Sequence, residues 1–207
     1  MKLETLQVMP LGTNCYLLCD EESGKCAVVD PGAEPERILR KVAESGCALQ
    51  CIFLTHGHYD HTGGVAGIQE AYPGIPVYLS SKDRYEDTAD PRIKMLYPAL
   101  SGNLVDWKEG DQVMLGSLTV TVLETPGHSK GSVTLQCGDI LLCGDTLFAG
   151  SCGRSDLAGG DTCELLSSLR RLGRLEGNYA VLPGHMDPSD LDRERETNPY
   201  LRQALRD

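Results

Sequence analysis

The sequence predicts an α/β (α+β) fold, a four-layer αββα sandwich in which two mixed β-sheets stack face to face between outer helices. Each half of the chain, roughly residues 1–80 and 110–185, contains several short apolar or alternating runs typical of strands, with helical patterns between them. The length of 207 residues, 41% of them hydrophobic, fits a single domain over 1–207 that buries a substantial core without disulfides.

In the first half, a strand and a helix follow one another repeatedly. The run 35–45 places its apolar residues on one face and stops at Gly46, which predicts a helix with a glycine C-cap. A second helix is predicted at 63–72. Strands are predicted at 3–9, 15–18, 25–30, 51–54 and 76–79.

The second half shows clearer strand patterns. Apolar and polar residues alternate over 118–123, as in a half-buried strand, and further strands are predicted at 112–115, 132–137, 140–143 and 179–182. Helices are predicted at 162–175 and at 188–207, the latter broken near Asn198-Pro199. The polar segment 82–108, which holds the single Trp, has no readable pattern, and we expect it to cover one side of a cleft.

Charge and cysteine content limit the partners and the compartment. The formal net charge of -11 argues against a nucleic-acid surface, which needs clustered Lys and Arg. No apolar run is long enough to span a membrane and no export signal is evident, so we expect no membrane partner and a cytoplasmic location. The nine cysteines are odd in number and lack a C-x-x-C pair, which favours reduced, mostly buried thiols.

All five histidines lie on turns that follow strand-like runs. Three belong to the stretch THGHYDH at residues 55–61, His128 follows Thr-Pro-Gly, and His185 follows Pro-Gly. A chain that places all its imidazoles at the ends of strands is expected to build one site from distant segments.

The spacing within THGHYDH predicts metal binding. Neither a regular helix nor a straight strand aims positions 1, 3, 5 and 6 of HGHYDH at one point, so we predict a turn, with Gly57 supplying backbone freedom. His56 and His58 can then bind one ion, while Asp60 and His61 bind a second.

Three further residues complete the predicted ligand sets. His128 and His185 each add an imidazole, and the carboxylate of Asp145, at the end of an apolar strand, can bridge ions about 3.5–4 Å apart. Imidazole and carboxylate suit zinc, with iron and manganese as near competitors. The predicted cofactors are therefore two divalent metal ions, with zinc preferred.

The motifs THGHYDH, TPGHS, GDTLF and PGH, in this order, resemble those of the metallo-β-lactamase fold superfamily, and the strand-end segment Val28–Gly32 fits the same pattern. The resemblance covers nearly the whole chain and implies the sandwich of two sheets. It assigns His56, His58 and His128 to a first metal and Asp60, His61 and His185 to a second, with Asp145 and a hydroxide between them.

Such a site predicts metal-assisted hydrolysis. Two cations lower the pKa of a shared water to about 7 and stabilise the oxyanion, so no serine or cysteine nucleophile is needed. Expelling an amine requires a proton donor, for which Asp60 is the evident candidate, whereas a thiolate, with a parent thiol pKa of about 8.5, leaves unaided. We therefore predict a thioesterase with Asp60 and Asp145 as catalytic residues.

A second resemblance refines the substrate. The segment from Asp145 to Arg154, with GRSDLAGGD and ETNPY, resembles the glyoxalase II enzymes, or hydroxyacylglutathione hydrolases, and above all their small bacterial branch, which lacks the long C-terminal helical glutathione-binding domain. This implies S-acylglutathione substrates such as S-lactoylglutathione, with Arg154 holding a carboxylate where the family typically has Lys. Asp156 replaces a typical aromatic residue, and Arg154 can instead pair with it and pin the loop.

Several alternatives remain open at this point. Tyr59 can bind substrate or form an ordinary cleft wall, and Lys82 and Arg84 can reach the cleft rim or stay solvated. The best rival function is that of the persulfide dioxygenases, which the chain also resembles and which use one iron, here held by His56, His128 and Asp145. A lactonase and a metal-dependent binding module without turnover are further alternatives. In each case the acidic chain around a cationic centre still admits a small anionic substrate.

Overall fold

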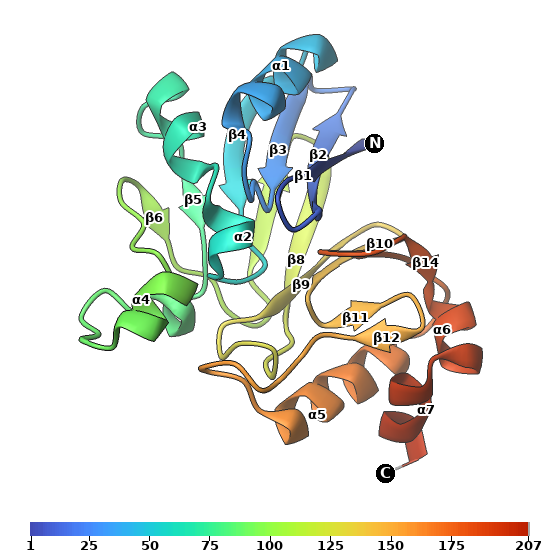
Figure 1. The fold of residues 1–207 in the computed structure, drawn as a ribbon. Helices are drawn as coiled ribbons and strands as arrows, with labels where there is room; N and C mark the ends of the chain where they lie inside the picture. The colour runs from blue at the N-terminus through green and yellow to red at the C-terminus, as the bar shows by residue number, and fades with distance from the viewer. Residues whose placement is uncertain (207) are drawn as a thin grey trace.

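Two six-stranded mixed sheets form the centre of the protein. A computed structural model, which describes residues 1–206, orders the first sheet β1-β2-β3-β4-β5-β6 and the second β14-β13-β10-β9-β8-β7. Helices α1 and α3 lie beside the first sheet, and α5, α6 and α7 gather at the second (Figure 1). This arrangement confirms the predicted fold class.

The first sheet and its helices come from the N-terminal half. Five of its strands, β1 to β5, lie within two residues of the predicted boundaries or extend them by up to three, whereas the short β6 was not predicted. The elements are β1 Lys2–Val8, β2 Thr13–Asp20, β3 Lys25–Val29, α1 Pro35–Ser45, β4 Ala48–Phe53, α2 Tyr59–Thr62, α3 Val65–Ala71, β5 Val77–Tyr78, the 3-10 helix η1 Ser81–Asp83, α4 Pro91–Leu96 and β6 Leu104–Val105.

The second sheet comes from the C-terminal half, together with a two-stranded hairpin, β11 and β12. The elements are β7 Gln112–Leu115, β8 Leu118–Glu124, β9 Val133–Cys137, β10 Ile140–Gly144, β11 Leu147–Phe148, β12 Ser151–Cys152, α5 Thr162–Gly173, β13 Ala180–Pro183, β14 Ser189–Asp190, α6 Leu191–Thr197 and α7 Pro199–Arg206.

The core has three apolar layers, and strand β2 shows why. All eight of its residues are buried, and alternate side chains point to opposite faces of the sheet. Tyr16 and Leu18 pack between the two sheets, whereas Leu17 packs under the helices on the outer face. A third cluster, between the second sheet and α5 to α7, includes Leu141 and Leu169.

One edge of each sheet, formed by the carboxyl ends of its parallel strands, lies beside the same edge of the other sheet. β3 and β4 run parallel in the first sheet, as do β10 and β13 in the second, so the residues after these strands emerge at the carboxyl ends. Backbone hydrogen bonds tie the two edges, from Asn14 N to the Gly184 oxygen at 2.7 Å and from Val133 N to the Thr55 oxygen at 2.8 Å. The predicted ligands follow these same strands.

Several local predictions need correction. THGHYDH is not a simple turn, because its second half forms the helical turn α2, and the predicted helix at 63–72 begins only at Val65. The segment 82–108 holds α4 and β6, and the terminal helix begins after β14 and breaks at Asn198 as predicted. All nine cysteines are free and six of them are buried. Within residues 1–206, no helix is long and apolar enough to cross a membrane.

Candidate metal centre

The structure brings together all seven side chains that the sequence predicts as ligands. They come from five places, all at the shared edge of the sheets: the β4–α2 loop, α2 itself, the β8–β9 loop, the residue after β10 and the loop after β13. They form a first group of His56, His58 and His128, a second group of Asp60, His61 and His185, and a third, between these two, of His56, His61 and Asp145; within each group the potential ligand atoms lie within 4.8 Å of one another.

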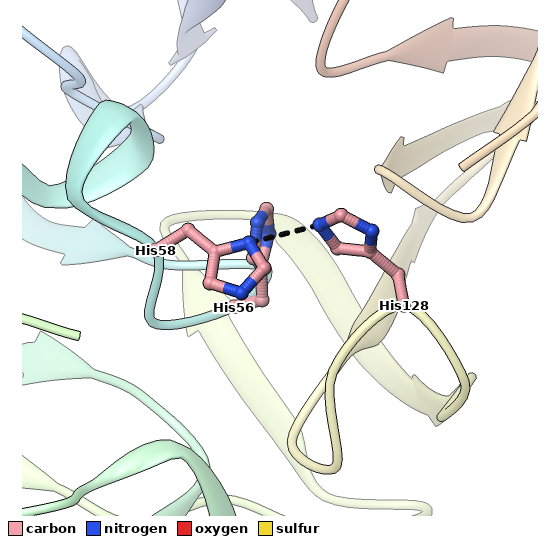
Figure 2. A group of neighbouring side chains, drawn as sticks. All are labelled: His56, His58 and His128. Carbon is pink, nitrogen blue, oxygen red and sulfur yellow. Dashed lines mark hydrogen bonds between the residues drawn. The ribbon is translucent and has the colours of Figure 1, made fainter. Parts of the chain in front are cut away.

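The first group consists of three buried imidazoles. Figure 2 shows His56 and His58 on one loop facing His128 from another. The Nε2 atom of His128 lies 2.9 Å from Nδ1 of His58. Two ring nitrogens this close either share one proton or face one cation.

The second group joins α2 to the loop after β13. Nε2 of His185 lies 3.2 Å from Oδ2 of Asp60, and Nε2 of His61 lies 3.7 Å from the same oxygen. A carboxylate facing two imidazole nitrogens offers three donor atoms to one ion.

Asp145 lies between the two groups. Its Oδ1 is 3.5 Å from Nε2 of His61, while its Oδ2 is 3.5 Å from Nε2 of His128 and 3.6 Å from Nε2 of His185. One oxygen therefore faces the second group alone and the other faces both, which is the placement that a bridging carboxylate requires.

Unpaired buried atoms test whether this cluster suits a metal. His56 Nε2, His61 Nε2 and Asp145 Oδ1 are all buried without a hydrogen-bond partner, and the three residues form one of the groups described above. A buried polar atom without a partner is costly, so three together indicate a shared ligand. Imidazole nitrogens and a carboxylate oxygen are donors for zinc, iron or manganese, and the residues fit such an ion.

A buried aspartate that the sequence interpretation left unassigned orients two of the histidines. Asp30 accepts hydrogen bonds from Nδ1 of His61 at 2.9 Å and from the amide and hydroxyl of Thr55 at 2.8 and 2.7 Å. Because the Thr55 hydroxyl proton goes to Asp30, Nδ1 of His56 donates to that hydroxyl oxygen at 3.1 Å. Both rings then direct Nε2 toward the cluster, which is how outer partners orient metal-binding histidines. The one sequence signal for Asp30 is its place in the strand-end segment Val28–Gly32.

A second missed carboxylate ties two ligand loops together. Asp83, buried in η1, accepts hydrogen bonds from Gly57 N at 2.9 Å, Ser129 Oγ at 2.6 Å and Gly131 N at 2.7 Å. Burial raises the pKa of its carboxyl, although these three hydrogen bonds oppose the rise. Asp83 therefore joins the loop of His58 to the loop of His128, and no local pattern in the polar segment 82–108 marks it.

Protonation differs between the histidines. Burial lowers the pKa of His56 well below its usual range and that of His58 to about 3, so both rings are neutral at pH 7 and able to bind a cation. Burial also opposes protonation of His61, but the carboxylates of Asp30 and Asp145 outweigh it and raise its pKa well above the usual range. A metal ligand must be deprotonated, so a bound cation would take the place of that proton.

Glycine is required at two positions around Asp145. A Cβ on Gly184 would lie 2.4 Å from Oδ1 of Asp145 and 2.6 Å from Cε1 of His61. Gly144 adopts a positive φ of 47°, and a Cβ there would lie 2.3 Å from Oγ1 of Thr55. The backbone passes so close to the cluster that side chains are excluded.

A cavity of about 560 Å³ opens beside the cluster. Tyr59, which is 42% exposed, and Arg154 both line it. Leu96 of α4 lines it as well, and this residue belongs to segment 82–108, which was predicted to cover one side of a cleft. The Arg154 guanidinium donates to both oxygens of Asp156, at 2.7 and 2.8 Å, while its backbone oxygen accepts from Nδ1 of His128 at 2.7 Å. Arg154 thus pairs with Asp156 and also lies on the cavity wall.

Two other cations, for which the cleft rim was one of two possible positions, lie away from the cavity. Lys82 pairs with Glu124 at 2.8 Å, and Arg84 donates to the Leu79 oxygen at 3.1 Å. Neither lines the cavity. Arg154 is therefore the one lysine or arginine on the cavity wall among residues 1–206.

Two stacked mixed sheets with a cluster of histidines and aspartates at one edge define a protein of the metallo-hydrolase class. The chain belongs to the metallo-beta-lactamase superfamily, whose family model matches residues 8–185. It is 33% identical to the probable metallo-hydrolase YqgX of Bacillus subtilis, covering 97% of this chain and 98% of that protein. It is 30% identical to the hydroxyacylglutathione hydrolase GloC of Haemophilus influenzae, again over 97% and 98%.

Solved structures agree with this assignment. TTHA1623 in a di-iron-bound form superposes with a TM-score of 0.82 at 36% identity, covering 95% of this chain and 99% of that one. The BLEG-1 B3 metallo-beta-lactamase superposes with a TM-score of 0.84 at 30% identity, covering 97% and 99%. The predicted superfamily is confirmed, and the glyoxalase II-like branch is plausible from the GloC relative.

Proposed function

We propose that this protein is a binuclear metal-dependent thioester hydrolase of the glyoxalase II type, acting on S-acylglutathione such as S-lactoylglutathione or on a related thioester. The observation that carries the proposal is the cluster of seven side chains, in which four buried atoms (on His56, His58, His61 and Asp145) have no hydrogen-bond partner, open to a cavity of about 560 Å³. The similarity to a hydroxyacylglutathione hydrolase supports the substrate class.

The ligands divide into two sets around Asp145. We assign His56, His58 and His128 to one ion, Asp60, His61 and His185 to the other, and Asp145 to both. Two divalent cations, most simply zinc with iron or manganese as alternatives, would supply a water acidic enough to ionise near pH 7 and would polarise the substrate carbonyl.

The residues of the chain itself favour a thioester over an amide. Asp60 lines the cavity, where its carboxylate can orient a water and accept a proton from it. Apart from the cluster, the side chains on the wall that carry a proton on oxygen, sulfur or nitrogen are those of Tyr59, Ser151, Cys152 and Arg154, and none is a ready acid for an amine. A thiolate leaves without one.

Two wall residues are proposed to contact the substrate. Arg154 is placed to attract a carboxylate, although it also pairs with Asp156, and Tyr59 offers an aromatic face beside Asp60. We propose a small anionic thioester as the substrate, with no nucleic-acid or membrane partner, in keeping with the net charge of -11. We also propose that residues 1–207 act as one domain in the cytoplasm, where nine free cysteines stay reduced.

Hydrolysis of S-lactoylglutathione at increasing zinc loading tests this function. The rate should rise until two ions are bound per chain. A protein filled with two ions that leaves S-lactoylglutathione and simple thioesters intact contradicts the proposal. Lactones, a β-lactam, and glutathione persulfide with oxygen, tested in parallel, identify the rival chemistries, and a single tightly bound iron would favour the last.

A further inference from the structure

The cavity beside the cluster has a mostly apolar wall, whereas glutathione is a thiol with two carboxylates. Outside the metal cluster, Ser151 and Arg154 are its more polar lining residues. The others are apolar or aromatic: Leu11, Tyr59, Leu96, Phe148, Cys152, Leu157 and Met186.

The cationic part of the wall is small. Among residues 1–206, Arg154 is the one lysine or arginine that lines the cavity, and Asp156 occupies its guanidinium with two hydrogen bonds. The Arg154 side chain is also 60% exposed, and screening by solvent further weakens its attraction for an anion. The wall thus offers one neutralised cation to a ligand with two carboxylates.

Apolar side chains at the cavity are also left open to solvent. Leu11 is 51% exposed and Met186 is 52% exposed, and both line the cavity. Exposed apolar residues gathered around a hollow mark a surface that a ligand covers.

Met186 is held in its place by a buried polar contact. It adopts a positive φ of 70°, which is uncommon for a residue other than glycine. The buried Asn14 amide donates to its carbonyl oxygen at 2.8 Å and to that of Pro183 at 3.0 Å. Backbone strain maintained by surrounding contacts is typical of functional sites, and here it presents an apolar side chain to the cavity.

We propose that the substrate carries an apolar chain of several carbon atoms, which lies against Leu11, Leu157 and Met186 while the thioester carbonyl faces the cluster. This inference rests on the proposed thioesterase function. In the reaction, water adds to the carbonyl carbon and the carbon–sulfur bond breaks with its electron pair on sulfur. The products are a carboxylate and a thiol, and one proton passes to solvent.

Two series of thioesters separate the possible positions of the apolar chain. In the first, acetyl, butanoyl, hexanoyl and octanoyl groups are joined to N-acetylcysteamine, and in the second the acetyl group is joined to ethane-, butane- and hexanethiol. With the zinc-loaded protein, kcat/KM should rise about 3- to 4-fold per methylene in one series until the cavity is filled. The series that rises identifies the acyl or the thiol side.

Binding without turnover provides a second measurement. S-hexylglutathione and S-methylglutathione are thioethers that cannot be hydrolysed, and calorimetry should show the hexyl compound binding at least about tenfold more tightly to zinc-loaded and to zinc-free protein. Met186→Ser and Leu157→Ser should reduce this preference. The matched control Met114→Ser, at a 60% exposed position on β7 outside the cavity, should retain it.

The outcomes separate the two proposals. Turnover of thioesters with kcat/KM independent of chain length in both series, or equal affinity for the two thioethers where the acyl series rises, overturns the apolar chain and leaves the thioesterase intact. A clear advantage of S-lactoylglutathione over every apolar thioester also overturns it. If no thioester is hydrolysed with two ions bound, the proposed function fails, and this inference fails with it.

Discussion

Replacing Asp60 with Asn removes one negative charge from the second group of ligands and leaves the size of the side chain unchanged. Oδ2 of Asp60 faces Nε2 of His185 at 3.2 Å and Nε2 of His61 at 3.7 Å, so the change affects one ion directly. Protein zinc sites bind with apparent free energies of about 10–16 kcal/mol, shared among about four ligands. One ligand is then worth about 3 kcal/mol, so we expect the second ion to bind about 100-fold more weakly.

Competition with a coloured chelator, followed by metal analysis of the dialysed protein, measures both affinities. The native protein should retain two ions per chain and the Asp60→Asn variant one, with most activity lost and the melting temperature of the metal-free form nearly unchanged. Asp139→Asn, which removes an exposed carboxylate from the β9–β10 turn, is the matched control and should behave as the native protein does. Two ions bound by Asp60→Asn with native affinity would refute the assignment.

Three other substitutions test separate parts of the structure. Arg154→Ala should raise KM for glutathione thioesters by up to about fivefold and leave uncharged thioesters unaffected, since an exposed charge contributes about 0–1 kcal/mol; equal changes for both would restrict Arg154 to pinning the loop. Asp83→Asn should lower the free energy of unfolding by about 1–3 kcal/mol, because the amide nitrogen in the place of Oδ2 cannot accept from Gly57 and Ser129, and calorimetry should show the melting temperature falling by about 2–4 °C for each kcal/mol. Asp20→Asn tests a pH effect: a hydrogen bond from the Ser117 amide at 2.7 Å lowers the pKa of Asp20 to about 2 from 3.8, so the carboxylate stabilises the fold above pH 3.8 and loses that contribution as the pH falls through about 2. Denaturant unfolding of both proteins should show a difference that is constant near neutral pH and disappears between about pH 4 and 2; a difference that persists at pH 2 would contradict this reasoning.

Long strands and amphipathic helices could be predicted from sequence because each has a local pattern. Alternation over 118–123 and the capped helix at 35–45 both occur where expected. The two-residue strand β6 has no such pattern, since pairing with the neighbouring strand β5 defines it. The same applies to the hairpin of β11 and β12.

The candidate ligands could be predicted from the sequence for a different reason. Histidines are few in this chain and all lie at strand ends, so their type and position were informative before any fold was known. Aspartates and glutamates number 30, and most are on the surface, so Asp30 and Asp83 could not be distinguished from the others. Their importance lies in burial and in partners far along the chain, such as Ser129 for Asp83, which sequence alone does not reveal.

The central claim is that two cations lie within one cluster of side chains. Anomalous X-ray scattering from crystals of the zinc-loaded protein tests this directly. We predict two peaks about 3.5–4 Å apart, one beside His56, His58 and His128 and the other beside Asp60, His61 and His185, with Asp145 in contact with both. A single peak, or peaks away from these side chains, would contradict the account.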